Sequence, residues 1–442
     1  MRSRPRLERA LVHAADRLRL PREAGLILGV FLAFRLMMLI TLRPEPLTFF
    51  GDYPYYYELA QLSDRGLWPY LHYWMEYPPI FPFLSTLIYR LTASGGYAAY
   101  TLTLSALNVL FGAANLILLM RLATRLHGAE RATRLGWVYS ALFVPLIFTW
   151  WQFETITACC ILFALDRLLE GRDVPSAIAA GLGVMLKLVP LLIVPAVALT
   201  RPIRKTARYV GIVAGLVLLI AAPLFVAAPD TTRASLASPL AWSSWETVWA
   251  LIDGNFRTGL LGGIDIHFDN ALATTPVGNP SRLPDWLKAI GFGIVYVLIL
   301  RRMRSASAQS AIGESAIGES ATGVASYRTV GILTVTYLVF ILWSKGWSPQ
   351  WQVTLIPLIL LMLPNASGIG FVLIFGLINL AEYPVLISRG LWGLVIVTIL
   401  LRTLLLIVLL IEVVRRCQRM ATDGRGQANK RIIGEPTNEP TN

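Results

Sequence analysis

The sequence is poor in charge and in cysteine for a chain of 442 residues. Only 15% of its residues are charged, whereas 55% are hydrophobic and the mean hydropathy is +0.60. This composition excludes an ordinary soluble globular protein, a coiled coil and a disordered chain. The three cysteines have no CxxC or metal-ligand spacing, so neither a disulfide scaffold nor a zinc site is expected.

Long hydrophobic runs stand where a soluble protein would have polar surface. Apolar runs of roughly 18 or more residues recur between residues 24 and 413, each about long enough to cross a hydrocarbon core of ~30 Å. We therefore expect an all-α polytopic membrane protein with about twelve transmembrane helices. The spans are predicted at 24–42, 97–120, 135–150, 154–169, 175–187, 189–200, 209–228, 287–300, 329–344, 350–363, 367–383 and 391–413.

Positive charge is concentrated at the ends of these runs. The net charge is +13, and six clusters of Arg and Lys each adjoin an apolar run. The positive-inside rule assigns such clusters to cytoplasmic loops, so the charge reports topology and no nucleic-acid partner is expected. We predict a multi-pass cell-membrane protein with both termini in the cytoplasm. It has a basic N-terminus (1–23), a transmembrane domain (24–413) and a polar tail (414–442).

Three segments interrupt the regular order of spans. Residues 80–91 are apolar but short, and we interpret them as an interfacial helix that closes the first external loop. Residues 175–200 are too few for two full crossings, which predicts a hairpin of two short helices with its tip near Lys187 and Pro190. The polar repeat SAIGES within residues 305–327 predicts a flexible cytoplasmic linker.

Two long external loops, 43–96 and 229–286, hold most of the polar aromatic residues, and we expect the function on their side of the membrane. Tyr and Trp side chains such as Tyr53 and Trp249 are common in membrane-interface belts, which is one interpretation. The other is sugar binding, because aromatic rings stack on the apolar faces of sugars while neighbouring acids bind the hydroxyl groups.

The first external loop contains two acidic residues in special local sequence. Asp52 lies in a Gly-Asp-Tyr-Pro turn, where it either caps a helix that starts near Pro54 or is held in one orientation for chemistry. Glu76 precedes Tyr77 and two prolines, a stiff segment that cannot continue a helix.

Polar residues also interrupt apolar sequence at three further points, which the topology brings to the same external side. Gln152 and Glu154 join two spans, Lys187 lies at the hairpin tip, and Lys345 and Gln350 join two later spans. A lysine within hydrocarbon costs ~2.5 to 3.5 kcal/mol, so Lys187 needs a partner or a polar cavity. Either it forms a salt bridge with Glu154 or snorkels to the interface, or the lysines bind an anion such as a lipid phosphate.

These motifs, in this order, resemble the membrane glycosyltransferases of the GT-C fold, and within them the polyprenyl-phosphate-mannose-dependent mannosyltransferases of glycosyltransferase family 87. The resemblance covers most of the chain from residue 24 to about 360. The matching positions are Asp52, Tyr55 to Pro79, Trp151 to Glu154, Lys187 with Pro190, and Ser348 to Trp351. The family often has Asp where this chain has Glu154.

The resemblance implies a hexosyltransferase that takes a sugar, mannose in the family, from a polyprenyl-phosphate donor and transfers it with inversion. The acceptor would be a glycan or glycolipid of the cell envelope on the external face. No cofactor and no metal are implied, and the chain has no Asp-x-Asp or Rossmann glycine pattern for a nucleotide sugar.

The resemblance also assigns roles to residues. Asp52 would be the catalytic general base, with an unshifted pKa near 4. The donor phosphate would be bound by Lys187, Lys345 and Gln350, since a phosphate leaving group needs cationic stabilisation. The sugar and acceptor would be bound by Tyr53, Glu76, Tyr77, Gln152, Glu154 and Trp249.

Two other classes are compatible with the same composition. A transporter or flippase of lipid-linked sugars would usually show internal repeats and buried charges near the midplane, whereas here no repeat relates the two halves and the polar residues gather on one face. An O-antigen polymerase or ligase would share the lipid-linked sugars and the large loops, but it gives no reason for the early Asp52.

Overall fold

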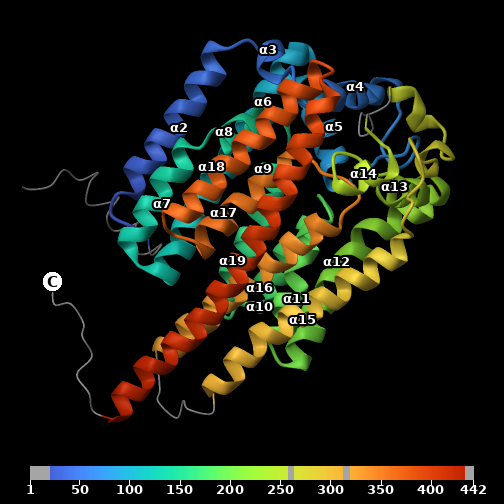
Figure 1. The fold of residues 1–442 in the computed structure, drawn as a ribbon. Helices are drawn as coiled ribbons and strands as arrows, with labels where there is room; N and C mark the ends of the chain where they lie inside the picture. The colour runs from blue at the N-terminus through green and yellow to red at the C-terminus, as the bar shows by residue number, and fades with distance from the viewer. Residues whose placement is uncertain (1–19, 257–262, 312–318, 434–442) are drawn as a thin grey trace, which may run out of the picture.

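The computed structural model describes residues 20–256, 263–311 and 319–433. Helices make up 81% of the structure, and the described residues form no β-strand (Figure 1). The all-α class expected from the sequence is confirmed.

Six helical segments of the described chain are long and apolar enough to cross a membrane. A seventh is added if the bent pair α7 (Ala129–Ala141) and α8 (Phe143–Trp151) forms one span. The six are α2 (Ala24–Thr41), Ile80–His127 with α5 (Ile80–Thr92) and α6 (Gly96–His127), α12 (Ile203–Ala227), Gly323–Trp343 of α16 (Glu319–Trp343), Ala366–Leu386 with α18 (Ala366–Leu380), and Trp392–Met420 of α19 (Trp392–Ile433).

The remaining predicted spans coincide with helices that do not meet this length and composition test. They are α9 (Glu154–Leu169), α10 (Asp173–Val184), η3 (Val189–Ile193) with α11 (Val194–Thr200), α15 (Asp285–Ala311), and η6 (Pro349–Trp351) with α17 (Gln352–Met362). Helices therefore lie where the sequence predicts spans, while the count of about twelve crossings stays a prediction. The hairpin tip lies between α10 and η3, and Lys187 is in it.

The bend of 50° between α7 and α8 has a local cause. Pro145 lies in the first turn of α8, so it has no N–H to donate to the carbonyl of Ala141, and its ring would clash there in a continuous helix. Leu142 between the two helices is extended, with φ −69° and ψ 132°. The sequence predicted one straight span at 135–150, and the proline divides it.

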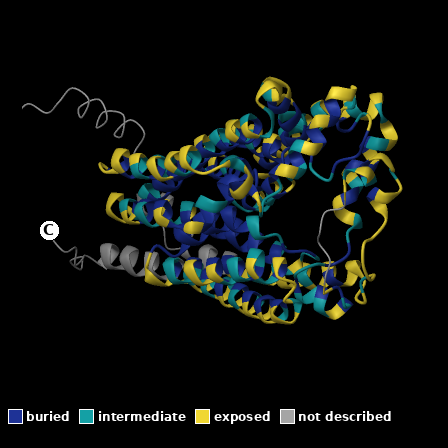
Figure 2. Cartoon of the chain, turned by 90° about the horizontal axis from the view of Figure 1, so that it is seen from above, coloured by how far each residue is buried: buried dark blue, intermediate teal, exposed yellow. Residues whose placement is uncertain are grey.

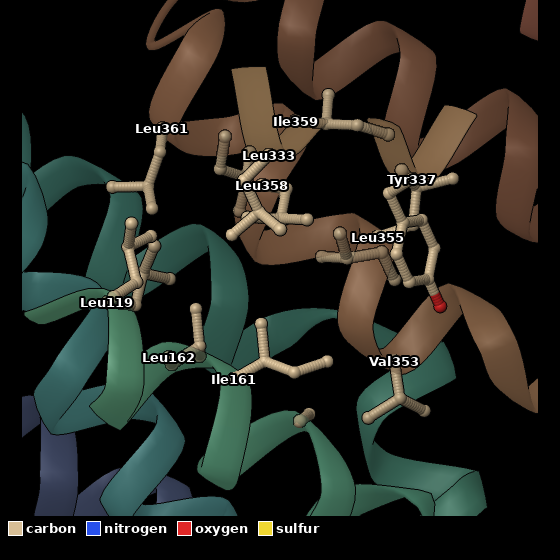
Figure 3. Packing of buried hydrophobic residues seen from close by; sticks show 14 of the residues in the cluster. Leu119, Ile161, Leu162, Leu333, Tyr337, Val353, Leu355, Leu358, Ile359 and Leu361 are labelled. Atoms are coloured by element: carbon tan, nitrogen blue, oxygen red, sulfur yellow. The ribbon is translucent and has the colours of Figure 1, made fainter. Parts of the chain in front are cut away.

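The core is built around a helix that is hydrophobic on every side. All residues of α17 are buried, and their side chains meet those of α6, α9 and α16, as Figure 3 shows for Leu119, Ile161, Leu333 and Leu358. A helix without a polar face is stable only when neighbouring helices surround it. In Figure 2 the exposed residues lie on the outside of the molecule. In the most apolar stretch of α12 only 11% of the residues are buried, whereas 72% are buried in that of α16. Helix α12 therefore lies at the outside of the bundle and α16 inside it.

The described basic clusters lie together at one end of the bundle. Arg121 and Arg125 of α6 form ion pairs of 2.9 and 3.2 Å with Glu170, just after α9. Arg201, after α11, is 2.9 Å from Asp173 at the start of α10. This shared end is the arrangement that the positive-inside pattern predicts for one side of a membrane.

The two long loops lie at the other end of the bundle and pack against each other (Figure 1). The first contains α3 (Pro44–Thr48), α4 (Tyr53–Gln61), η1 (Leu62–Arg65) and α5, and the second contains α13 (Pro229–Ala241), α14 (Val248–Asp253), η4 (Ile264–Phe268) and η5 (Leu272–Thr274). The backbone N–H of Trp74 donates to His267 O at 3.0 Å, and its indole Nε1 donates to Ile266 O at 3.0 Å. Helix α9 begins at this end and ends near the basic end, about 24 Å away at 1.5 Å per residue.

Three boundaries differ from the sequence expectation or lie outside the described residues. Helix α15 continues to Ala311 and α16 begins at Glu319, so helix extends from both sides into the segment predicted to be a flexible linker. Helix α19 continues past residue 413 to Ile433, through most of the predicted tail. Alanine, glutamine and glutamate support helix beyond an apolar run, a signal that hydropathy does not measure. Residues 1–19, 312–318 and 434–442 lie outside the described chain.

Candidate functional site

A cavity of about 810 Å³ opens at the end of the bundle that carries the two long loops. This volume is in the range of small-molecule sites. Most of the residues that the sequence predicts for the site line this cavity, namely Asp52, Glu76, Tyr77, Gln152, Lys187, Lys345 and Gln350. They come from segments far apart in the chain, so the fold brings them together.

One side of the cavity, here called the acidic wall, consists of Asp52, Glu76, Tyr77 and Gln152. Its position depends on a close backbone approach next to Asp52. The Asp52 N–H donates to Trp151 O at 2.9 Å, and a Cβ added at Gly51 would lie 2.4 Å from Trp151 Cα. Only glycine fits between these two segments, which fixes Asp52 beside the start of α9.

The Asp52 side chain points to neutral hydrogen-bonding groups. Tyr56 Oη donates to Asp52 Oδ2 at 3.3 Å and lies 2.5 Å from Gln152 Oε1. Asp52 occupies the N-cap position of α4, but its side chain accepts no capping hydrogen bond. The capping role considered for Asp52 is therefore not observed, and the carboxylate is available to the cavity.

The pKa of Asp52 differs from the sequence expectation of an unshifted carboxyl group. Burial raises the pKa of Asp52, and this effect outweighs the hydrogen bonds from Gln152 and Tyr56 and the positive charge of Lys187, which all lower it. A carboxylate with a raised pKa is a stronger proton acceptor than a free one.

Glu76 is held by a tyrosine on α4. Tyr55 Oη lies 3.0 and 3.1 Å from the two carboxyl oxygens of Glu76. Burial raises the pKa of Glu76 to about 7, and the negative charge of Asp52 also raises it, while the hydrogen bond from Tyr55 lowers it. The negative charge of Asp52 thus favours the protonated form of Glu76.

A second group of lining residues, here called the lysine wall, consists of Lys187, Lys288 and Lys345. Lys187 Nζ donates to Glu154 Oε2 at 2.6 Å, and the Glu154 side chain is 1% exposed. The salt bridge considered as the structural role of Lys187 is therefore present. Lys187 also lines the cavity, so the ion pair holds its ammonium group at the cavity surface.

The other two lysines share one carboxylate. Asp285 lies 2.7 Å from Lys288 Nζ and 3.4 Å from Lys345 Nζ, which also donates to Leu240 O at 3.0 Å. Burial alone would raise the pKa of Asp285, but the two ammonium groups lower it below the usual value. Gln350 lies in η6 and lines the same side.

Three predicted site residues do not line the cavity. Glu154 lies behind Lys187 in the ion pair. Tyr53 is fully buried, with its hydroxyl donating to Thr149 O at 2.9 Å. The Trp249 indole donates to Leu342 O at 3.1 Å, and its ring lies 5.3 Å from Lys288 Nζ. Tyr53 and Trp249 support cavity residues and do not face a substrate directly.

Sequence reasoning missed three charged residues near the cavity. Lys288 follows Asp285 by one helical turn in the run DWLK, a pairing that could have drawn attention to it. Glu246 lines the cavity with φ +51°, an unusual conformation for a residue with a side chain. Arg402 of α19 forms a buried ion pair with Glu382, donates to Glu246 O, and lies 4.7 Å from the Trp347 ring centre.

The arrangement joins a proton acceptor to a cationic surface across one cavity. Within the described chain, no three His, Cys, Asp or Glu side chains lie close enough together to hold a metal ion. The groups present can accept a proton from a hydroxyl group on the acidic wall and stabilise an anion on the lysine wall.

The family model of glycosyltransferase family 87 matches residues 74–324, more than half of the 442 residues. The match contains Glu76, Gln152, Glu154 and Lys187, begins after Asp52 and ends before Lys345. No curated protein matches the chain.

Proposed function

The chain belongs to glycosyltransferase family 87 and is a membrane glycosyltransferase, and from this premise we propose that it transfers a sugar from a polyprenyl-phosphate donor in the cavity described above. The acceptor in this proposal is a glycan or glycolipid of the cell envelope, and the sugar is mannose. Asp52 is the general base, and Lys187, Lys345 and Gln350 bind the donor phosphate.

One observation carries the proposal: the carboxylate of Asp52 and the lysine wall face the same cavity of about 810 Å³. Transfer to a hydroxyl group needs a base on the acceptor side and cations on the leaving-group side. Separate clusters at two ends of the molecule could not perform this reaction in one step.

The reaction is a single displacement at the anomeric carbon. The acceptor oxygen forms a bond to this carbon, its proton passes to Asp52, and the bond from the carbon to the phosphate oxygen breaks. Polyprenyl phosphate leaves with the bonding electrons, and its negative charge is stabilised by Lys187 and Lys345. Attack opposite the leaving group inverts the anomeric configuration.

The apolar part of the cavity supports a lipid-linked donor. Beside the lysine wall the lining includes Leu188, Leu191, Leu240 and Trp343, all of which are more than one-third exposed. Exposed large apolar side chains next to a cavity in a membrane protein can contact both lipid and ligand. A polyprenyl chain could therefore extend along these residues while its phosphate contacts the lysines.

The positions of the basic residues at one end of the bundle support an external location of the cavity. If the end with Arg121, Arg125 and Arg201 is cytoplasmic, as the positive-inside rule predicts, the cavity opens on the other side. Labelling with an impermeant thiol reagent tests this. A cysteine introduced at Lys345 should react from outside, and one introduced at Arg204 only after the inner face is opened.

The direct test is a panel of polyprenyl-phosphate sugars incubated with the purified full-length protein and a glycolipid extract as acceptor. Release of free polyprenyl phosphate with one sugar, and inverted linkage in the product, is the expected result. Movement of intact lipid-linked sugar across vesicles, with no release of polyprenyl phosphate, would instead support a transporter or flippase.

A further inference from the structure

A chain of three hydrogen-bonding side chains leads away from the cavity behind the acidic wall. Glu76 contacts Tyr55 Oη through both carboxyl oxygens at 3.0 and 3.1 Å. The same Tyr55 hydroxyl lies 2.8 Å from His267 Nε2. His267 belongs to the second long loop and is 1% exposed, so the chain of contacts joins the two loops.

The contact of the other ring nitrogen of His267, Nδ1, determines where one hydrogen of the imidazole lies. His267 Nδ1 lies 2.7 Å from Trp74 O, which can only accept, so Nδ1 carries a hydrogen. In neutral His267 the Nε2 atom then has a lone pair and accepts from Tyr55. In charged His267 it carries a hydrogen and donates to Tyr55.

Tyr55 has a single hydroxyl hydrogen for two close partners. If Tyr55 donates to neutral His267, Glu76 must be protonated to fill the other contact. If Tyr55 donates to the Glu76 carboxylate, His267 must be protonated. If Glu76 is ionised and His267 is neutral, both need the one hydrogen of Tyr55. At the contact that does not receive it, a lone pair of Tyr55 Oη faces a lone pair of its partner at about 3 Å, and one buried hydrogen bond is lost.

We propose that Glu76, Tyr55 and His267 form a proton relay in which one proton is shared between the Glu76 carboxyl group in the cavity and the His267 imidazole behind it. When the proton leaves Glu76 it passes to Tyr55 Oη, and the hydroxyl hydrogen of Tyr55 passes to His267 Nε2. The reverse transfers restore the first state, so no other reactant is needed. The role of the relay in sugar transfer rests on the proposed function.

The surroundings of the relay disfavour a lasting charge at either end. The negative charge of Asp52 raises the pKa of Glu76, and Glu76 in turn raises the pKa of Tyr55, Tyr56, Tyr70 and Tyr77. Burial raises the pKa of Glu76 to about 7 and lowers the pKa of His267 below its usual value, so burial favours the neutral form of both groups.

The relay acts on the catalytic base through charge. Glu76 and Asp52 are both on the acidic wall, and the negative charge of Asp52 raises the pKa of Glu76. Repulsion between two carboxylates is mutual, so an ionised Glu76 also makes Asp52 a stronger base. When the proton is on His267, Asp52 is therefore the stronger base. His267 and Tyr55 are positioning residues in this scheme, because they act through Glu76 and do not touch the substrate.

Infrared titration of the purified protein tests the relay without any substrate. The carbonyl band of protonated Glu76 is identified as the band that Glu76→Gln removes. His267→Asn keeps an amide donor for Trp74 O, and His267→Gln keeps a group that reaches Tyr55, but neither can take up a proton. In both variants the Glu76 band should persist to a pH about one unit higher than in the wild type.

A double variant separates a relay from independent effects. Tyr55→Phe should also shift the Glu76 band to higher pH, and adding His267→Gln to it should cause no further shift, because the connection is already broken. His72→Gln is the matched control, since His72 lies in the first loop, is exposed and accepts from the Trp68 N–H at 3.0 Å. It should leave the band unchanged.

In the transfer assay, His267→Gln should move the low-pH limb of the rate toward lower pH. A Glu76 band that does not move in either His267 variant, or that moves additively in the double variant, would overturn the relay. Absence of sugar transfer in every protein, with the band shifts present, would overturn the proposed function and leave the relay standing.

Discussion

The acidic wall of the cavity is held by hydrogen bonds from neutral side chains, whereas the lysine wall is held by ion pairs. Asp52 and Glu76 accept from tyrosine hydroxyls. Lys187 has Glu154 as a carboxylate partner, and Lys288 has Asp285. Burial raises the pKa values of the two acids, and these hydrogen bonds offset that effect only in part, while each lysine has a carboxylate within ion-pair distance.

This difference determines what each wall can do when a substrate arrives. A carboxylate whose pKa is raised by burial is a better proton acceptor, which suits a base. An ammonium group already paired with a carboxylate can bind a phosphate only by leaving the carboxylate or by contacting both anions, which limits its affinity for the phosphate. Before the donor binds, the same carboxylate reduces the cost of burying the ammonium charge.

Replacing the base should have the largest effect. Asp52→Asn keeps the shape of the side chain but removes general-base assistance, so the transfer rate should fall ~10² to 10⁴-fold. Donor binding should be unchanged, because the base acts on the acceptor. Single-turnover release of polyprenyl phosphate, with a separate donor-binding titration, measures both quantities.

The matched control for Asp52 lies in the same loop. Asp64 pairs with Arg90 at 3.1 Å and is 52% exposed, so Asp64→Asn should keep the wild-type rate. A normal rate in Asp52→Asn together with a large loss in Asp64→Asn or Glu76→Gln would remove Asp52 from its role.

The next largest effect is expected from Lys187→Met. Loss of a charge-assisted contact should weaken donor binding ~10- to 100-fold. Glu154 would remain buried without its partner, and breaking a buried pair costs about 3 to 5 kcal/mol of stability. Donor titration and denaturant unfolding measure the two losses separately.

A second substitution at the same pair distinguishes binding from structure. Lys187→Met combined with Glu154→Gln removes both charges, so stability should recover while donor binding stays weak. Recovery of donor binding together with stability would mean that Lys187 serves only the ion pair.

Asp285 tests whether the carboxylates of the lysine wall compete with the donor. Asp285→Asn should tighten donor binding by about two- to fivefold, because Lys288 and Lys345 lose an ion pair worth up to about 1 kcal/mol. Lys288→Met should act in the opposite direction. Weaker donor binding in Asp285→Asn would show that the carboxylate orients the lysines and does not compete with phosphate.

The smallest effect is a pH dependence of stability. Burial raises the pKa of Glu76 from 4.5 to about 7, so between these pH values folded Glu76 holds a proton that the unfolded chain has lost. Its contribution to stability should therefore decrease as pH rises from about 4.5 to about 7. In Glu76→Gln the unfolding temperature should change less with pH over that range, and the difference from the wild type should be a few degrees at most. An unchanged slope would place this titration elsewhere.

Site residues that interrupt apolar runs were easier to predict from the sequence than site residues within polar segments. Lys187, Gln152 and Lys345 stand out because hydrocarbon makes each of them costly, and all three line the cavity. Lys288 and Glu246 also line it, but they lie within or next to the long second loop, where a single charge stands out less, and only the spacing of Asp285 and Lys288 pointed to Lys288.

Orientation within the aromatic loops could not be predicted in the same way. Four tyrosines lie between residues 53 and 57, and the helical rotation of α4 decides that Tyr56 reaches Asp52 while Tyr53 is buried against Thr149. The contact between Tyr55 and His267 joins residues from two different loops, a pairing that local sequence does not encode. The all-α class followed from composition and the approximate positions of the helices followed from the hydrophobic runs, whereas the ends of α15, α16 and α19 and the break between α7 and α8 did not.

The Arg402–Glu382 ion pair sets a condition on membrane insertion. Arg402 lies within an apolar span, where an arginine costs about 2.5 to 3.5 kcal/mol on insertion scales, and its partner lies at the end of the preceding span. The charge is neutralised only when both segments are present, so we expect the translocon to release α18 and α19 as a helical hairpin. A membrane-insertion assay can compare α19 alone with α18 and α19 together. Arg402→Leu should improve the insertion of α19 alone more than the insertion of the two helices together. Equal improvement in both cases would contradict joint release. Helix α19 would then complete the cavity, because Arg402 also binds Glu246 O.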